Sequence, residues 1–153
     1  MSKDKIKLSI CIPTYNRPRA FKRLLSHLLP QIDNRIEIVV RDDSPNDDSK
    51  KIFHSLVNNT KINYKYFHDS KIGLDAANLF LLENASGDYI WWFGDDDELL
   101  DGGIKAVLNL IDKYNDLNFI WANFALSDKS NLAVDRSNGF FESGDDILES
   151  LGT

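Results

Sequence analysis

The sequence contains a single cysteine, Cys11, among its 153 residues, so no disulfide can form within the chain. One cysteine inside an apolar run is typical of a small buried side chain, and the lack of a disulfide framework favours a reducing compartment. No apolar run approaches the roughly 20 residues that span a bilayer. The charged segment Met1 to Lys7 also lacks the apolar stretch of a signal peptide. We therefore expect a soluble cytoplasmic protein, with peripheral association at the inner membrane face as an alternative.

Basic residues are fewer than acidic residues in this sequence. Lysine and arginine total 18 against 24 aspartate and glutamate, which gives a net charge of -6. This balance argues against general binding to nucleic acid or to an anionic membrane surface. It is compatible with a site for a divalent cation. The apolar content of 42% excludes a disordered chain and suits one compact domain with a core.

Several catalytic motifs are also absent. We find no G-x-G-x-x-G after a strand pattern, no Walker loop, no H-E-x-x-H and no G-x-S-x-G. An EF-hand loop that starts at Asp95 fails, because its fifth position is Leu99.

What is present is an alternation of strand and helix patterns, which predicts an α/β fold with a mostly parallel sheet and helices on both faces. The predicted strands are Leu8 to Ile12, Ile36 to Val40, Ile62 to Phe67, Tyr89 to Phe93 and Phe119 to Ala125. Between them, helical spacing of apolar residues predicts four helices. The first begins near Pro18, the second contains Ile52 to Val57, the third covers Leu74 to Glu83 and the fourth contains Ile104 to Ile111. A polar loop over Ser127 to Asn138 and the start of a helix over Ser143 to Leu151 follow. Because the pattern stops there, we expect residues 1–153 to be one truncated domain portion.

The most polar segments all follow strands. In open parallel sheets, ligands bind outside the carboxyl ends of the strands, so these segments are expected to line one site. They are Pro13 to Arg17 after the first strand, Asp42 to Ser44 after the second, His68 to Lys71 after the third and Asp95 to Asp97 after the fourth.

The triplet Asp95 to Asp97 is the strongest of these signals. Adjacent carboxylates repel one another, and a hard divalent cation such as Mg²⁺ or Mn²⁺ relieves that repulsion. Because Mg²⁺ takes few protein ligands and completes its shell with phosphate oxygens and water, the triplet suggests a metal-bridged phosphate ligand. A solvated turn that caps the helix near Leu99 is an equal alternative.

Five further side chains suit a nucleotide. Asp42 and Asp43 can accept hydrogen bonds from a base or ribose, Tyr15 can stack on a base, and Arg17 and Lys71 can pair with phosphate. Each has an alternative role: the aspartates as a capped turn, which taken alone is favoured, Tyr15 as a rim residue, and the two cations as solvated charges.

Three segments in order resemble one enzyme family. They are Ile12 to Pro18, Val39 to Ser44 and Gly94 to Asp97, and together they are similar to inverting glycosyltransferases of family 2, which have the GT-A (Rossmann-like) fold. The resemblance covers roughly Leu8 to Asn123. It implies transfer of a sugar, with inversion, from a nucleoside diphosphate sugar to an acceptor hydroxyl, with many bacterial cell-surface polysaccharide enzymes among the members.

The resemblance also implies site residues and ligands. The nucleotide-binding residues would be Pro13, Thr14, Tyr15, Arg17, Asp42, Asp43, Lys71, Gly73, Asn78 and Asp95, and the metal-binding residues Asp96 and Asp97. The cofactor would be Mg²⁺ or Mn²⁺, the donor a UDP- or dTDP-sugar, and the acceptor a saccharide or a lipid-linked molecule. The family usually has aspartate at the position of Gly94, and its general base lies in an acceptor-binding part that we expect beyond Thr153. Apolar surface left bare there could support a homo-oligomer.

Other functions are weighed against this one. A receiver-like signalling domain needs an acidic pair after the first strand, where this chain has Pro13 to Arg17. A nucleotidyltransferase needs a glycine-rich basic loop there, which is also missing. A non-catalytic module that binds nucleotide and metal remains open.

Overall fold

The computed structural model describes residues 5–114, 116–118, 120 and 122. The chain divides into two compact units, residues 1–116 and 117–153, and the sheet with its helices belongs to the first. The predicted loop Ser127 to Asn138 and the predicted helix Ser143 to Leu151 lie outside the described residues, as does all but residues 120 and 122 of the predicted strand Phe119 to Ala125.

A parallel sheet of four strands forms the centre of the first unit. The strands are β1 (Leu8–Thr14), β2 (Ile36–Asp42), β3 (Asn63–His68) and β4 (Tyr89–Trp92), in the order β3-β2-β1-β4. Every residue of β2 is buried, as expected for a strand covered on both faces. This arrangement confirms the α/β fold predicted from the sequence.

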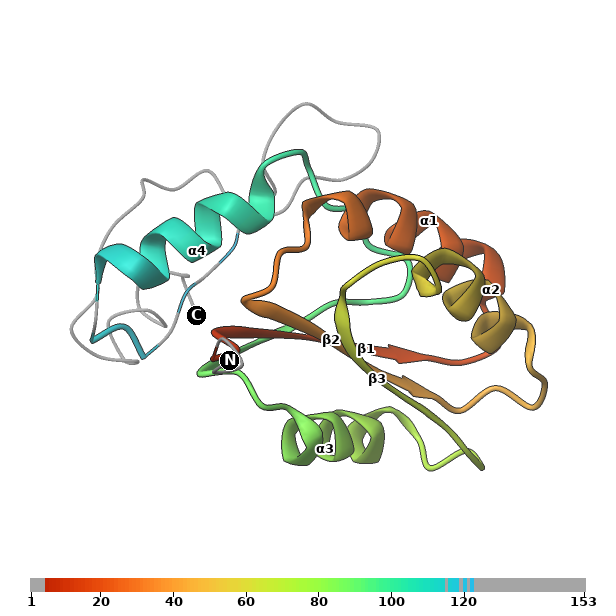
Figure 1. Ribbon diagram of the computed structural model, residues 1–153. Coiled ribbons are helices and arrows are strands. Elements are labelled where there is room, and N and C mark those ends of the chain that lie inside the picture. The colour runs from red at the N-terminus through yellow and green to blue at the C-terminus, as the bar shows by residue number, and fades with distance from the viewer. Residues whose placement is uncertain (1–4, 115, 119, 121, 123–153) are drawn as a thin grey trace, which may run out of the picture. The chain divides into compact units, whose positions relative to one another are not determined.

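The described residues form four α-helices, and the first three of them connect the strands. They are α1 (Pro18–Leu28), followed by a 3₁₀ turn (η1, Leu29–Gln31), α2 (Asp48–Val57), α3 (Leu74–Asn84) and α4 (Gly103–Lys113). Helices α1 and α2 lie together over one face of the sheet, and α3 lies against the opposite face (Figure 1). Phe53 of α2 stacks on Phe21 of α1 and packs edge-on against Tyr64 of β3. On the other face, Leu81 of α3 packs with Cys11 and Val39.

The strands β1 and β2 each run two residues beyond their predicted ends. The predictions stopped at Ile12 because Pro13 follows, and at Val40 because the charged residues Arg41 to Asp43 follow. In the structure Pro13 pairs with Arg41 and Thr14 pairs with Asp42, so the ladder continues into the polar segment. Thr14 and Asp42 are therefore buried strand residues with fixed backbones, and not loop residues.

The strand order places a switch point at the carboxyl end of β1. The chain runs outward from β1 to β2 and β3, then crosses back to form β4 on the other side of β1. In open α/β sheets a ligand binds in the crevice where the strand order reverses. The segments that follow β1 and β4 therefore face each other at this crevice.

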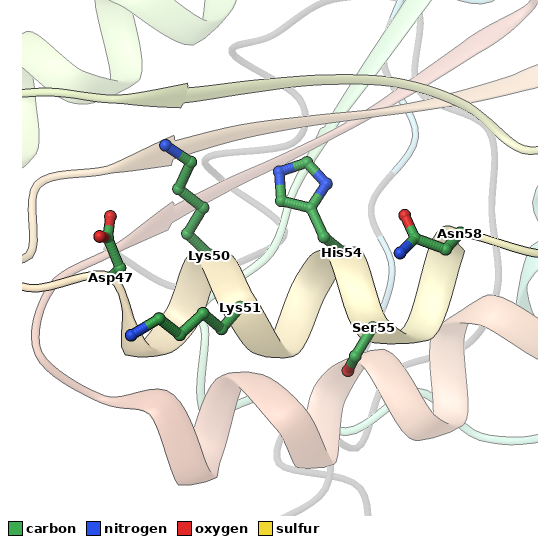
Figure 2. A pocket seen from close by; sticks show the side chains of 6 residues that line it. All are labelled: Asp47, Lys50, Lys51, His54, Ser55 and Asn58. Carbon is green, nitrogen blue, oxygen red and sulfur yellow. The ribbon is translucent and has the colours of Figure 1, made fainter.

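A shallow depression of about 390 Å³ lies on α2 (Figure 2). Its lining comes from this helix and the residues that flank it: Asp47, Lys50, Lys51, His54, Ser55 and Asn58. None of the residues predicted to bind nucleotide or metal lines it, and the chemistry is better sought at the carboxyl edge of the sheet.

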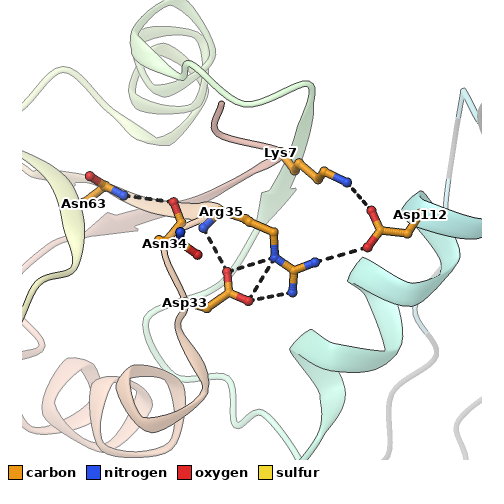
Figure 3. Close-up of polar contacts among 6 residues, drawn as sticks. All are labelled: Lys7, Asp33, Asn34, Arg35, Asn63 and Asp112. Atoms are coloured by element: carbon orange, nitrogen blue, oxygen red, sulfur yellow. Dashed lines mark hydrogen bonds and ion pairs between the residues drawn. The ribbon is translucent and has the colours of Figure 1, made fainter. Parts of the chain in front are cut away.

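The amino edge of the sheet is closed by ion pairs (Figure 3). Asp112 of α4 pairs with Lys7 and with Arg35, which precede β1 and β2, and Arg35 also pairs with Asp33. The Lys7 ammonium, and less strongly Arg35, hold the pKa of Asp112 below its usual value, and Arg35 does the same to the pKa of Asp33. These contacts fix α4 to the end of the sheet opposite the candidate site.

Candidate functional site

A hydrogen bond joins β1 to the segment after β4. The hydroxyl of Thr14 donates to Oδ2 of Asp95 at 2.7 Å, and both side chains are buried. A buried carboxylate is costly unless it is hydrogen-bonded or paired with a cation, and Asp95 has both kinds of partner. The bond fixes the first aspartate of the triplet at the switch point.

Arg17 bridges two of the triplet's carboxylates. Its Nη1 lies 3.3 Å from Oδ1 of Asp95 and 2.9 Å from Oδ2 of Asp96. A second arginine, Arg23 of α1, donates to the carbonyl oxygen of Asp96 at 3.2 Å and pairs with Glu98 at 2.8 Å. Arg17, just before α1, and Arg23, within α1, thus supply positive charge to the acidic segment, which lowers the repulsion that the sequence predicted there.

The triplet does not cap a helix. Helix α4 begins only at Gly103, after Gly102 in a left-handed conformation (φ 80°), so the capping alternative for Asp95 to Asp97 is wrong. Instead, Oδ2 of Asp97 accepts a 2.9 Å hydrogen bond from the backbone nitrogen of Gly94 and closes a tight turn.

The absence of a side chain at Gly94 leaves a small cradle between carboxylates. A Cβ atom there would lie 3.1 Å from Oδ1 of Asp96 and 3.1 Å from Oδ2 of Asp97. Among the described residues, no three acidic, histidine or cysteine side chains gather into a preformed metal site. Mg²⁺ needs only one or two protein carboxylates when phosphate and water complete its shell. The oxygen-only donor set of Asp96 and Asp97 therefore fits a hard divalent cation brought in with a phosphate ligand.

Asp42 is fully buried, and both of its carboxylate oxygens have partners. One accepts from the backbone nitrogen of Ser44 at 3.0 Å, and the other accepts from the hydroxyl of Tyr66 at 2.6 Å. Burial, and then the bond to Asp42, raise the pKa of Tyr66 well above its usual value, so the phenol stays protonated and donates. The Ser44 contact is the turn geometry weighed as the alternative role of this residue. In this conformation both carboxylate oxygens of Asp42 are engaged within the chain.

Asp43 forms a buried ion pair with Arg41. Nε of Arg41 lies 2.7 Å from Oδ1 of Asp43, and each side chain is about 5% exposed. The same two residues hold the segment after β3: Arg41 donates to the carbonyl oxygen of Ser70 at 2.9 Å, and Asp43 accepts from the backbone nitrogen of Ile72 at 2.9 Å. We name this set of contacts the Arg41–Asp43 clamp. It joins the ends of β2 and β3.

Lys71 lies between the two clamped residues. Its ammonium lies 4.1 Å from the centre of the Tyr15 ring, which is 45% exposed. Tyr15 itself is held by its neighbour Asn16, whose backbone nitrogen donates to the Ser44 hydroxyl at 2.8 Å and whose φ is 54°. Asparagine tolerates this left-handed conformation better than most residues.

The structure thus brings most of the predicted residues to one edge, in three groups. Thr14, Arg17, Asp95 and Asp96 form the first group, and Tyr15 and Lys71 the second. Asp42 and Asp43 form the third, with partners of their own. Pro13 belongs to β1, Gly73 (φ 89°) precedes α3, and Asn78 lies within α3.

Sequence reasoning missed Arg41, Tyr66 and Arg23. Arg41 had a detectable signal, because a charged residue in an otherwise apolar buried strand must find a partner. The position of Tyr66 one residue before the end of its predicted strand offered only a weak signal. Nothing in the sequence indicated the contact of Arg23 with the acidic segment.

The chain resembles known proteins over most of its length. Residues 9–148 match a family model described as glycosyl transferase family 2. A relative from Campylobacter jejuni, GalNAc(5)-diNAcBac-PP-undecaprenol beta-1,3-glucosyltransferase, is 29% identical over 143 residues, which cover 92% of this chain and 45% of that protein. The abequosyltransferase RfbV of Salmonella typhimurium is 32% identical over 117 residues, which cover 72% of this chain and 34% of that protein.

The chain is also similar to a solved structure. The crystal structure of S. aureus TarS 1-349 in complex with UDP-GlcNAc has a TM-score of 0.64 and 26% identity, and the match covers 72% of this chain and 32% of that one. The chain therefore spans less than half the length of each of these relatives.

Proposed function

Because this chain belongs to glycosyl transferase family 2, we propose that residues 1–153 form the donor-binding portion of an enzyme that transfers a sugar from a nucleoside diphosphate sugar to an acceptor hydroxyl. The transfer would proceed with inversion at the anomeric carbon. The observation that carries the proposal is the group formed by Thr14, Arg17 and Asp95 at the switch point, where a parallel sheet binds its ligand.

The relatives favour a nucleotide donor and a lipid-linked or saccharide acceptor, and we extend the proposal to bacterial cell-surface polysaccharide synthesis. The TarS structure was determined with UDP-GlcNAc, which favours a uridine nucleotide, and dTDP is the alternative. The Campylobacter relative carries a polyprenol diphosphate in its name, which favours a lipid-linked or saccharide acceptor. No helix within the described residues is long and apolar enough to cross a bilayer. We propose that the protein meets such an acceptor as a peripheral protein at the inner membrane face.

In the proposed site, the base, the diphosphate and the metal ion are each bound by different residues. The exposed ring of Tyr15 offers a stacking surface for the base, beside the segment fixed by Asp42 and Asp43. Arg17 and Lys71 offer positive charge to the diphosphate. Asp96 and Asp97 would hold Mg²⁺ or Mn²⁺, which neutralises charge on the leaving diphosphate when it is bound.

In the proposed mechanism the residues of this chain bind and orient the donor, and a group outside them removes the acceptor proton. Arg17 and Lys71 would bind and orient the diphosphate, and the buried Thr14–Asp95 bond would keep the carboxylates in place. A general base that takes the acceptor proton is proposed to lie beyond Thr153. On this basis the 153-residue chain binds donor and transfers little or no sugar.

Self-association remains a prediction. Large apolar side chains are exposed on α3 and β4: Leu74, Leu79, Leu82 and Trp92. Such surface is compatible with a partner or a second copy.

Thermal unfolding with a panel of nucleotides tests the proposed donor. UDP, dTDP, GDP and ADP would each be added together with Mn²⁺. A nucleotide present at about 100 times its Kd stabilises the protein that binds it by about 2.7 kcal/mol. We expect UDP or dTDP to raise the melting temperature and GDP and ADP to leave it unchanged. A chain that no nucleotide stabilises would contradict the proposal.

A further inference from the structure

The contact between Lys71 and Tyr15 joins two strand ends that are not neighbours in the sheet. Tyr15 follows β1, Lys71 follows β3, and β2 lies between those strands. The ammonium lies 4.1 Å from the ring centre, within the roughly 6 Å over which a cation is attracted to an aromatic face. The contact therefore extends over the end of β2, where Asp42 and Asp43 lie.

The backbone on both sides of Lys71 is fixed. The carbonyl oxygen of Ser70 accepts from Arg41, and the backbone nitrogen of Ile72 donates to Asp43. Both clamp residues are buried, so the clamp is shielded from solvent. The lysine side chain is exposed and has a flexible four-carbon stem. Lys71 can consequently move its ammonium by several ångströms while its backbone stays in place.

One face of the Tyr15 ring is covered by the ammonium of Lys71, which follows β3. A base that stacks on this face therefore meets the ammonium. A base that stacks on Tyr15 and also lies beside Asp42 and Asp43 needs the same space as the ammonium. Base and ammonium therefore compete for one aromatic face.

We propose that Lys71 is a displaceable occupant of the stacking face of Tyr15, and that a nucleotide base displaces its ammonium toward the diphosphate of the same ligand. This inference rests on the proposed function and adds a rearrangement to it. The ammonium would lower the affinity for a nucleoside, which offers only a base and ribose. It would raise the affinity for a nucleoside diphosphate, because the displaced ammonium forms a charge-assisted contact with the diphosphate. Lys71 would thus discriminate between ligands with and without a diphosphate.

The first test observes the contact in the ligand-free chain. Ring currents of Tyr15 should shift the ε-methylene signal of Lys71 upfield, and the shift should be absent in Tyr15→Leu. Titration with UDP should abolish the shift at saturation. A shift that persists in the UDP-bound chain would overturn the proposal, because the ammonium would then still lie on the ring.

The second test measures uridine and UDP binding to Lys71→Met, which keeps the stem and removes the charge. Loss of an exposed cation–π contact should tighten uridine binding about two- to fivefold. Loss of the ammonium should weaken UDP binding about tenfold. Lys105→Met, on the exposed surface of α4, is the matched control and should change neither affinity.

The outcomes separate the two proposals. Opposite changes for uridine and UDP in Lys71→Met support the displacement. Changes of the same sign, or no change for uridine, overturn it and leave the donor site intact. If the wild-type chain binds neither ligand, the proposed function fails and the displacement fails with it.

Discussion

The Thr14 hydroxyl donates a 2.7 Å hydrogen bond to the carboxylate of Asp95, which lies 81 positions further along the chain. The bond joins the central strand to the acidic segment across the switch point of the sheet. It links two features that were separate in the sequence: a polar strand end and an aspartate triplet. We expect the position of the acidic segment to depend on this bond.

Thr14→Val should destabilise the chain, because it leaves one oxygen of a buried carboxylate without its hydrogen bond. The expected loss in the free energy of unfolding is about 1–3 kcal/mol. Urea denaturation at neutral pH measures it. Thr60→Val, at an exposed position where the hydroxyl bonds only to the nearby Val57 carbonyl, should cost about 0.5 kcal/mol. Equal losses in the two variants would contradict the importance of the Thr14 bond.

Asp43→Asn should cost more, because it leaves the Arg41 guanidinium buried without its counter-charge. Removing one partner of a buried ion pair typically costs about 3–5 kcal/mol. Asp101→Asn, on an exposed turn, is the control and should be nearly neutral. Hydrogen exchange gives a second readout: the amide of Ile72, which donates to Asp43, should exchange faster in Asp43→Asn. An unchanged exchange rate would show that the clamp does not hold this segment.

Arg17→Gln should strengthen the binding of Mn²⁺ in the absence of nucleotide, because the arginine already neutralises Asp95 and Asp96. Arg17 is 57% exposed, so solvent weakens these pairs and the gain should be only about two- to fivefold. Electron paramagnetic resonance of free Mn²⁺ measures it. Lys22→Gln, on the exposed surface of α1, serves as the control. Weaker Mn²⁺ binding in Arg17→Gln would place the cation away from these carboxylates.

The thiol of Cys11 should resist labelling until the chain unfolds. Burial, and then the nearby Glu37 carboxylate, raise the pKa of Cys11 from 9.0 to about 12, so the reactive thiolate is disfavoured in the folded state. Rapid labelling by a thiol reagent at pH 8 without denaturant would contradict this burial.

The same shift of the Cys11 pKa makes stability depend on pH. The stability due to the neutral thiol is complete below pH 9 and is lost as the pH rises toward 12. The loss is at most about 1.4 kcal/mol per pH unit. The free energy of unfolding of Cys11→Ala should therefore fall less than that of the wild type between pH 9 and pH 11. Parallel curves of unfolding free energy against pH would show that the Cys11 thiol does not cause the loss.

The sequence predicted the sheet well because its strands are short apolar runs between helices with clear apolar faces. Phe21, Leu24, Leu25 and Leu28, spaced as a helix requires, are all buried on α1. Strand ends were harder to place. Thr14 and Asp42 are polar, yet both continue a strand because their side chains find partners in the folded chain. Hydrophobic periodicity contains no information about such partners.

The sequence predicted that the polar segments gather at one edge of the sheet, and it predicted only some of their contacts. The rule that ligands bind at the carboxyl ends of parallel strands placed the predicted segments at one edge. The rule could not foresee that Asp42 bonds to Tyr66, or that Asp43 pairs with Arg41. The contact of Asp42 with Tyr66 comes from the register between β2 and β3, which only the folded structure supplies. The pair of Asp43 with Arg41 is local, because these residues are two positions apart at the end of β2.

The most direct test of the proposed donor site is a calorimetric titration of UDP into the wild-type chain and into Asp96→Asn, with and without Mn²⁺. Binding should require Mn²⁺ in the wild type and should be reduced at least tenfold, roughly, in Asp96→Asn. Asp101→Asn should bind as the wild type does. Binding of equal strength in Asp96→Asn, or no binding of UDP or dTDP under any condition, would contradict a metal-dependent donor site at these carboxylates.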